Sequence, residues 1–74
     1  MNTRKLFYVT AKDTNRLFFM AGPFNEHEKA LELVDSAMQA AAEIDPRSWW
    51  MDWGTIGCDD VKSCPLNDAL NVKA

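Results

Sequence analysis

The sequence predicts a small two-layer α+β domain, an antiparallel sheet with one amphipathic helix on one face. Two stretches rich in aromatic and β-branched residues precede a long segment of helical periodicity, and a tryptophan-rich stretch follows it. Short apolar, β-branched runs are typical of strands, whereas apolar residues spaced by three and four are typical of a helix. The predicted order is therefore β-β-α-β, in a single domain that spans residues 1–74.

The composition of the 74-residue chain is that of a globular domain. Apolar residues make up 47% of it and charged residues 26%, and the formal net charge is -3. This mild acidic balance disfavours a protein that follows phosphate groups, because such proteins usually carry a basic excess. No apolar run approaches the roughly 20 residues needed to cross a bilayer, and no targeting signal is visible. We therefore expect a cytoplasmic protein without membrane contact.

The first two strands are expected to form a hairpin. The stretches "KLFYVTA" at 5–11 and "RLFFMA" at 16–21 are apolar and rich in strand-forming residues, and the polar turn "KDTN" joins them. A connection this short makes the two strands antiparallel. Pro23 cannot donate a hydrogen bond to a sheet ladder, so pairing should end there.

The helix is predicted over residues 26–44. Asn25 is a good N-cap, and Glu28 three residues later would complete a capping box. Pro46 ends the helix, because the residue before a proline is pushed out of the α region. An apolar stripe repeats along one side of the segment: Ala30, Val34, Ala37, Ala41 and Ile44. The opposite side carries a stripe of mostly acidic residues: Glu28, Glu32, Asp35, Gln39 and Glu43.

The stretch "SWWMDW" at 48–53 is predicted as the third strand, and residues 54–74 as an irregular segment. Within that segment, "LNDAL" at 66–70 suits one helical turn or a short final strand. Alternate strand side chains point to opposite faces, so Trp50 and Asp52 would share one face. Because an unpaired carboxylate is costly to bury, we expect this face to meet solvent. The other face should lie under the helix with Trp49, Met51 and Trp53.

The sheet is expected to have a second apolar face that the helix cannot cover. Neither strand of the hairpin has a polar side, so a surplus of aromatic and Met side chains is left over: Tyr8, Phe18, Met20 and Trp50, with Arg47 close by in sequence. Large exposed apolar patches usually mark interaction sites, where aromatic residues and Arg are enriched. Three coverings stay open: the C-terminal segment 61–72 folded back, a homodimer through the open sheet face or an edge strand, and a foreign partner.

The sequence shows no pattern that supports catalysis or metal binding. His27 lies between two glutamates in the first turn of the helix, where exposure is expected, and Asp59-Asp60 has no third acidic ligand at a suitable spacing. Cys58 and Cys64 are typical of a reduced cytosolic pair, with a disulfide as the alternative. We therefore expect a protein that is not an enzyme and has no cofactor and no metal.

The leading hypothesis from these residues is a binding protein. The predicted contact surface consists of Trp50, Tyr8, Phe18 and Arg47, and a second candidate surface consists of Glu28, Glu32 and Asp35. The alternative hypothesis is a small nucleic-acid- or nucleotide-binding domain, because aromatic side chains on an open sheet can stack on bases. The acidic net charge makes nucleic acid the less favoured partner.

The chain resembles a group of small phage and prophage proteins of Gram-negative bacteria that lack an assigned activity. The motifs that carry the resemblance are Gly22-Pro23-Phe24, Ala30, Asp45-Pro46, Trp49, Gly54-Thr55 and Leu66-Asn67. The resemblance implies a phage-derived cytoplasmic protein that binds and inhibits or modulates a bacterial host protein, such as a component of antiviral defence. It implies no catalytic residues.

Overall fold

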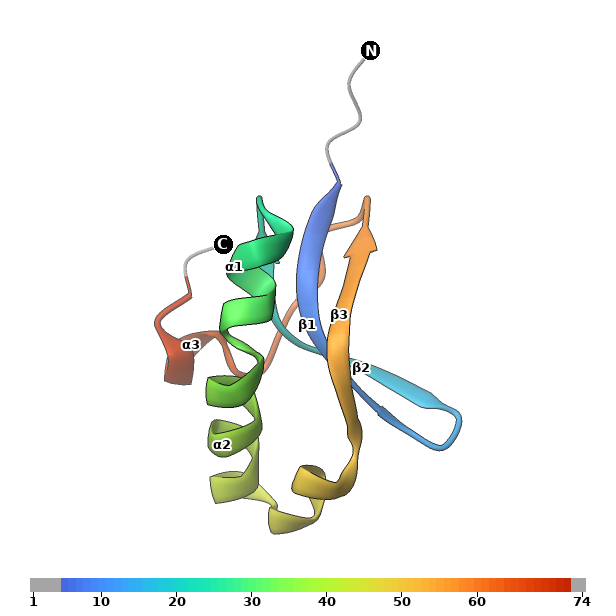
Figure 1. Cartoon of the computed structure of the whole chain (residues 1–74), viewed down its shortest axis with the longest axis vertical. Coiled ribbons are helices and arrows are strands. Elements are labelled where there is room, and N and C mark those ends of the chain that lie inside the picture. The colour runs from blue at the N-terminus through green and yellow to red at the C-terminus, as the bar shows by residue number, and fades with distance from the viewer. Residues whose placement is uncertain (1–4, 73–74) are drawn as a thin grey trace.

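The protein forms a three-stranded antiparallel sheet with helices against one face (Figure 1), as seen in a computed structural model that describes residues 5–72. The strands are β1 (Leu6–Asp13), β2 (Arg16–Phe24) and β3 (Asp52–Cys58), in the spatial order β2-β1-β3. The α+β prediction is confirmed. Because β1 is central, both β2 and β3 have an outer edge.

The hairpin of β1 and β2 extends as an arm beyond the rest of the sheet (Figure 1). Both strands run further than predicted, and the last pair of the arm is Asp13 with Arg16. The turn is tight because Thr14 takes a left-handed φ of 57°. The helices do not cover this arm, so Leu17 and Phe18 on β2 are 44% and 39% exposed.

The predicted single helix is divided into α1 (His27–Glu32) and α2 (Val34–Ile44), with the break at Leu33. The capping prediction was wrong: Glu26 takes the N-cap position, and its side chain makes no capping hydrogen bond. The core between these helices and the sheet is built mainly from small side chains, which allow close approach. It consists of Val9, Ala21, Ala30, Ala37, Ala41 and Leu66.

The third strand lies later in the sequence than predicted. Residues 46–50 form a 3₁₀-helix, η1 (Pro46–Trp50), and β3 begins only at Asp52. Asp45 caps η1 by accepting a hydrogen bond from the backbone N–H of Arg47, at 3.1 Å. Asp followed by Pro is a signature of a helix start as well as of a helix end, and this start overrides the strand pattern.

The arrangement of the tryptophans follows from η1 rather than from strand alternation. Trp50 is 84% exposed, as predicted, but Trp49 is also 46% exposed and does not lie under the helix. Trp53 on β3 is half-buried, and its indole N–H donates to the carbonyl oxygen of Ser48 at 2.8 Å. The predicted burial of Trp49 was therefore wrong, because neighbouring residues on a 3₁₀-helix do not alternate between two faces.

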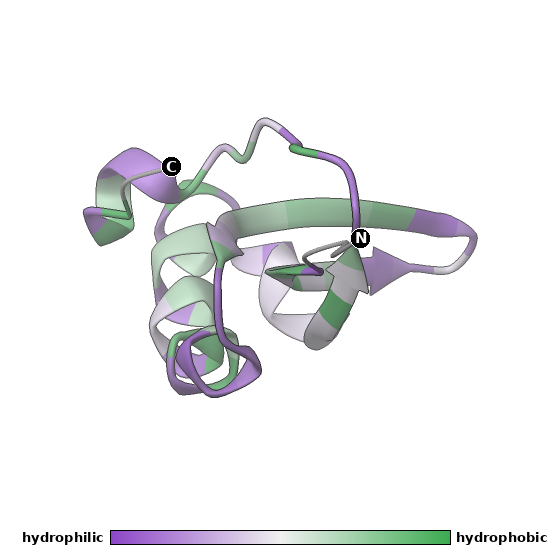
Figure 2. Cartoon of the chain, turned by 90° about the horizontal axis from the view of Figure 1, so that it is seen from above, coloured by the Kyte–Doolittle hydropathy of each residue, from purple (hydrophilic) through white to green (hydrophobic). Residues whose placement is uncertain are grey.

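The C-terminal segment covers the second face of the sheet, one of the three coverings left open by the sequence. In Figure 2 this segment and the helices lie on opposite sides of the sheet. Tyr8 is fully buried there: its hydroxyl donates to the carbonyl of Asp60 at 2.7 Å and accepts from the N–H of Lys62 at 2.9 Å. The expectation that Tyr8 lies on an open surface was wrong, because these backbone groups satisfy its hydroxyl away from solvent.

The same segment then passes the outer edge of β2 and ends in α3 (Asn67–Leu70), so "LNDAL" supplies a helical turn. Leu66 enters the core, and its N–H donates to the carbonyl of Met20 on β2 at 2.9 Å. The Asn67 side chain bonds the N–H and the carbonyl of Gly22. The Gly-Pro-Phe and Leu-Asn motifs are therefore in direct contact.

Candidate functional site

A concave region lies where the hairpin arm meets η1 and the end of α2. Two adjoining hollows of about 310 Å³ and about 290 Å³ share Asp45, Ser48 and Met51 in their walls. We call this region the arm groove. Its remaining wall residues are Asp13, Phe18, Met20, Ala41, Ile44, Arg47, Trp50, Pro65 and Leu66.

Four separate stretches of the chain supply the apolar wall of the arm groove. Phe18 comes from β2, Ile44 from the last residue of α2, Trp50 from η1, and Pro65 from the C-terminal segment. Ile44 is 75% exposed and Trp50 is 84% exposed, so their apolar area faces solvent. A concave apolar surface with few polar groups is the usual form of a binding site.

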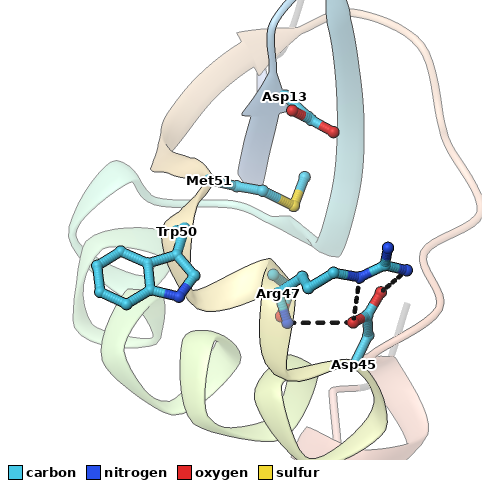
Figure 3. Close-up of a pocket in the computed structure, with 6 residues that line it drawn as sticks. Asp13, Asp45, Arg47, Trp50 and Met51 are labelled. Atoms are coloured by element: carbon cyan, nitrogen blue, oxygen red, sulfur yellow. Dashed lines mark hydrogen bonds and ion pairs between the residues drawn. The ribbon is translucent and has the colours of Figure 1, made fainter.

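The polar side of the arm groove is dominated by one ion pair (Figure 3). Arg47 Nε lies 3.3 Å from Asp45 Oδ1, and Arg47 Nη2 lies 3.4 Å from Asp45 Oδ2. The hydrogen bonds from Arg47 lower the pKa of Asp45, and the same bonds raise the pKa of Arg47. The Arg47 side chain is 90% exposed, so the pair adds little to stability and instead orients the guanidinium beside the groove.

Figure 3 shows how the labelled residues of this hollow lie. Met51 is situated between Asp13, at the end of β1, and the Asp45–Arg47 pair. The Trp50 ring and the Arg47 guanidinium extend to different sides of η1. The single short helix η1 thus places an exposed indole ring and a guanidinium group paired with Asp45 next to an apolar hollow.

The structure brings three of the four predicted contact residues to one region and excludes the fourth. Trp50, Phe18 and Arg47 all line the arm groove. Tyr8 is buried on the opposite face of the sheet, under the C-terminal segment. The base-stacking alternative thereby loses one of its three predicted aromatic residues.

The predicted acidic surface is exposed and separate from the arm groove. Glu28 and Glu32 lie on α1, Asp35 lies in the first turn of α2, and all three are exposed. The groove instead adjoins the last turn of α2, at Ala41 and Ile44. Within residues 5–72 the three carboxylates form no salt bridge, so their charge is available to a basic partner.

Sequence reasoning missed Ile44 and Met51 as groove residues. Ile44 fits the apolar repeat of the helix, and this repeat predicts that it is buried in the core. It is instead the last residue of α2, where the sheet no longer covers the helix, and it is exposed. Met51 was assigned to the buried face of a strand that the chain does not form. The Asp45-Pro46 helix-start signature could have revealed both errors, because it places η1 directly after α2.

The residues considered for chemistry have structural roles or lie apart. His27 Nε2 lies 2.9 Å from the Thr55 hydroxyl, and its ring lies against Phe7 with centroids 5.3 Å apart. Cys58 and Cys64 are free, and burial raises the pKa of the Cys64 thiol. No cluster of three potential metal ligands occurs within residues 5–72.

The helices of the described part of the chain are all too short or too polar to span a bilayer. Comparisons of the chain with protein-family models, with curated proteins and with solved structures found no match. The arm groove is therefore the main basis on which a function can be argued.

Proposed function

We propose that this chain is a non-enzymatic binding protein that takes a protein partner in the arm groove. The observation that carries the proposal is that three exposed apolar side chains from separate elements line the arm groove: Phe18 and Ile44 in one hollow, and Trp50 in the adjoining one. Solvent exposure of such a cluster is unfavourable in a free protein, and its burial by a partner removes that cost.

The composition of the groove resembles that of an interaction hot spot. Trp and Arg are the residue types most often found there, and both extend from η1. The Asp45–Arg47 pair holds the Arg47 guanidinium, so less conformational entropy is lost when a partner carboxylate or carbonyl binds it. A partner with an apolar anchor flanked by an acidic or carbonyl group suits this surface best.

The resemblance to phage proteins supports a bacterial host protein as this partner. On that basis, binding inhibits or modulates the host protein, as an anti-CRISPR or other anti-defence protein does. The exposed carboxylates of Glu28, Glu32 and Asp35 add a second surface that suits a basic groove.

The test is affinity capture from bacterial lysate, followed by binding measurements with the purified partner. We expect Trp50→Ala to weaken binding by about 2 kcal/mol or more, which is a roughly thirty-fold loss of affinity. Trp49→Ala is the matched control, because Trp49 is an exposed neighbour of the same type that lines neither hollow. Leu31→Ala, at a half-exposed residue of α1, is a second control.

Two results would contradict the proposal. Equal capture of the partner by wild type and Trp50→Ala would exclude the arm groove as the contact surface. Binding that disappears after nuclease treatment and falls steeply with added salt would indicate nucleic acid instead. Charge reversal at Glu32 and Asp35 tests the acidic surface separately, since neither residue lines the groove.

A further inference from the structure

The two outer edges of the sheet differ in how they are covered. Along β2, the pairing with β1 has two register shifts, Pro23 lacks an N–H, and Leu66 and Asn67 bond the backbone of Met20 and Gly22. Along β3, the pairing with β1 is continuous from Leu6 with Cys58 to Lys12 with Asp52. Bulges, prolines and covering segments are the devices that protect an edge strand, and β2 has all three.

The outer edge of β3 has none of these devices. After the charged Asp52 at its start, β3 continues as "WGTIGC" at 53–58, with no charged residue and no proline, and within residues 5–72 no segment pairs with this edge. An edge strand presents a row of unpaired N–H and C=O groups, which form hydrogen bonds to any strand that lies beside them. An unprotected edge of this kind is a surface for strand addition.

The side chains of β3 indicate which strand fits. If a second copy of β3 lies antiparallel with Thr55 on the two-fold axis, Trp53 faces Gly57 of the copy, and Ile56 faces Gly54 of the copy. Each large side chain then lies opposite a glycine. Directly opposed residues on neighbouring strands are close enough to pack against one another, so this alternation of size keeps two large side chains from standing opposite each other.

The surroundings of the two glycines agree with this pairing. A Cβ atom built on Gly54 meets nothing within 4 Å, so there is space on that face for an isoleucine. At Gly57 the aliphatic chain of Lys5 already fills the side-chain position, since an added Cβ would lie 2.9 Å from its Cδ atom, and the ring of Phe7 lies beside it. Trp53 of a second copy would therefore pack on the flexible Lys5 chain, whose ammonium group can lie against the indole, rather than in open space.

We propose that two copies of this chain pair antiparallel through β3, with Thr55 at the two-fold axis, to form one continuous sheet. The helices of both copies then lie on the same face of that sheet, because the axis is perpendicular to it. The pairing uses the backbone of β3 and leaves the wall residues of the arm groove out of the strand contact. It neither requires nor excludes the partner proposed for that groove.

The first test is the mass in solution, by light scattering over a range of protein concentrations. We expect a species with twice the 8.4 kDa mass of the chain, which dissociates on dilution. Gly54→Lys places a charge where Ile56 of the copy should pack and should halve the observed mass. Its backbone φ is ordinary and its Cβ position is open, so the variant should remain folded, which circular dichroism checks.

The matched control is Leu17→Lys, which adds the same charge at an exposed residue of β2, the strand at the opposite edge of the sheet. This variant should leave the dimer intact. A monomer at every concentration would overturn the proposal, and would leave the β3 edge free for a strand of another protein. A dimer that Gly54→Lys does not dissociate would equally overturn it, since the contact would then lie elsewhere.

A second readout fixes the register. In a Cys58→Ser, Cys64→Ser background, Thr55→Cys places two thiols opposite each other at the axis, and we expect an intermolecular disulfide under mild oxidation. Val61→Cys, at a 74% exposed residue outside the strand, is the control and should cross-link far more slowly. Equal cross-linking of the two variants would contradict the pairing at Thr55.

Discussion

The side-chain amide of Asn67 bonds both backbone polar groups of Gly22, which lies 45 positions earlier in the chain. The amide oxygen accepts from the Gly22 N–H at 2.9 Å, and the amide nitrogen donates to the Gly22 carbonyl. The Asn67 side chain thus makes the two hydrogen bonds that a neighbouring strand would otherwise make to Gly22, at the irregular end of β2. This contact joins the C-terminal segment to the edge of the sheet and aligns Leu66 with the core.

Replacement of Asn67 by alanine should therefore destabilise the protein. Gly22 is buried, and a buried backbone group left without a partner costs about 1–3 kcal/mol. Urea denaturation of Asn67→Ala should show this loss as a lower midpoint, whereas Ser63→Ala, at an exposed residue of the same segment, should not change it. An unchanged midpoint for Asn67→Ala would mean that water replaces the amide without cost.

Gly22 and Gly54 should respond in opposite ways to a methyl group. Gly22 has a φ of +140°, and an added Cβ would lie 2.5 Å from Cδ2 of Tyr8. We expect Gly22→Ala to cost more than about 1 kcal/mol, and Gly54→Ala to be neutral or slightly stabilising because its Cβ position is open. Thermal unfolding of the two variants measures the difference, and equal melting temperatures would contradict it.

The hydroxyl of Tyr8 should matter for stability and not for binding. Tyr8→Phe keeps the ring edge-to-face with Phe19 but removes both hydrogen bonds to the C-terminal segment. The loss should be about 1–3 kcal/mol, with faster hydrogen exchange at the Lys62 amide. Trp50→Phe, at an exposed residue, should stay within about 0.5 kcal/mol of wild type.

Tryptophan fluorescence should separate the three indoles. Trp50 is 84% exposed and Trp49 is 46% exposed, while Trp53 is half-buried and bonded to Ser48. Quenching by iodide should therefore fall most in Trp50→Phe, less in Trp49→Phe and least in Trp53→Phe. The reverse order would require a different structure for η1.

The Cys64 thiol should ionise less readily in the folded protein than in the unfolded chain. Burial raises its pKa, so the contribution of Cys64 to stability is fully present below the unfolded pKa and is lost as pH rises through the folded pKa. In a Cys58→Ser background, alkylation of Cys64 should be slower than in urea at the same pH. Equal rates under the two conditions would show that the thiol is not shielded.

The hairpin and the long helical segment could be predicted because their patterns are local. Two short apolar runs rich in aromatic and β-branched residues in 5–21 and a helical repeat in 30–44 each indicate the geometry of their own backbone. The break at Leu33 was not predicted, since no proline or glycine marks it. The third strand was misplaced because the alternation in "SWWMDW" was read without the Asp45-Pro46 helix start that precedes it.

For the candidate site, the residue types could be predicted, and their grouping could not. Trp50, Phe18 and Arg47 were identified from composition, and all three line the arm groove. Ile44 and Met51 were not identified, because exposure at the end of a helix depends on where the sheet stops. Tyr8 was assigned to the surface because the segment that buries it lies more than 50 positions away.

The sequence alone therefore determined the kinds of secondary structure, the polarity of the helix and the surplus of aromatic side chains, since these depend on short-range periodicity and composition. The tertiary structure decided which surplus residues stay exposed. The C-terminal segment satisfies the Tyr8 hydroxyl and the Gly22 backbone, and it thereby buries one face of the sheet. No local sequence pattern indicates which face of the sheet is buried, because hydrogen bonds between distant segments depend on the path of the whole chain.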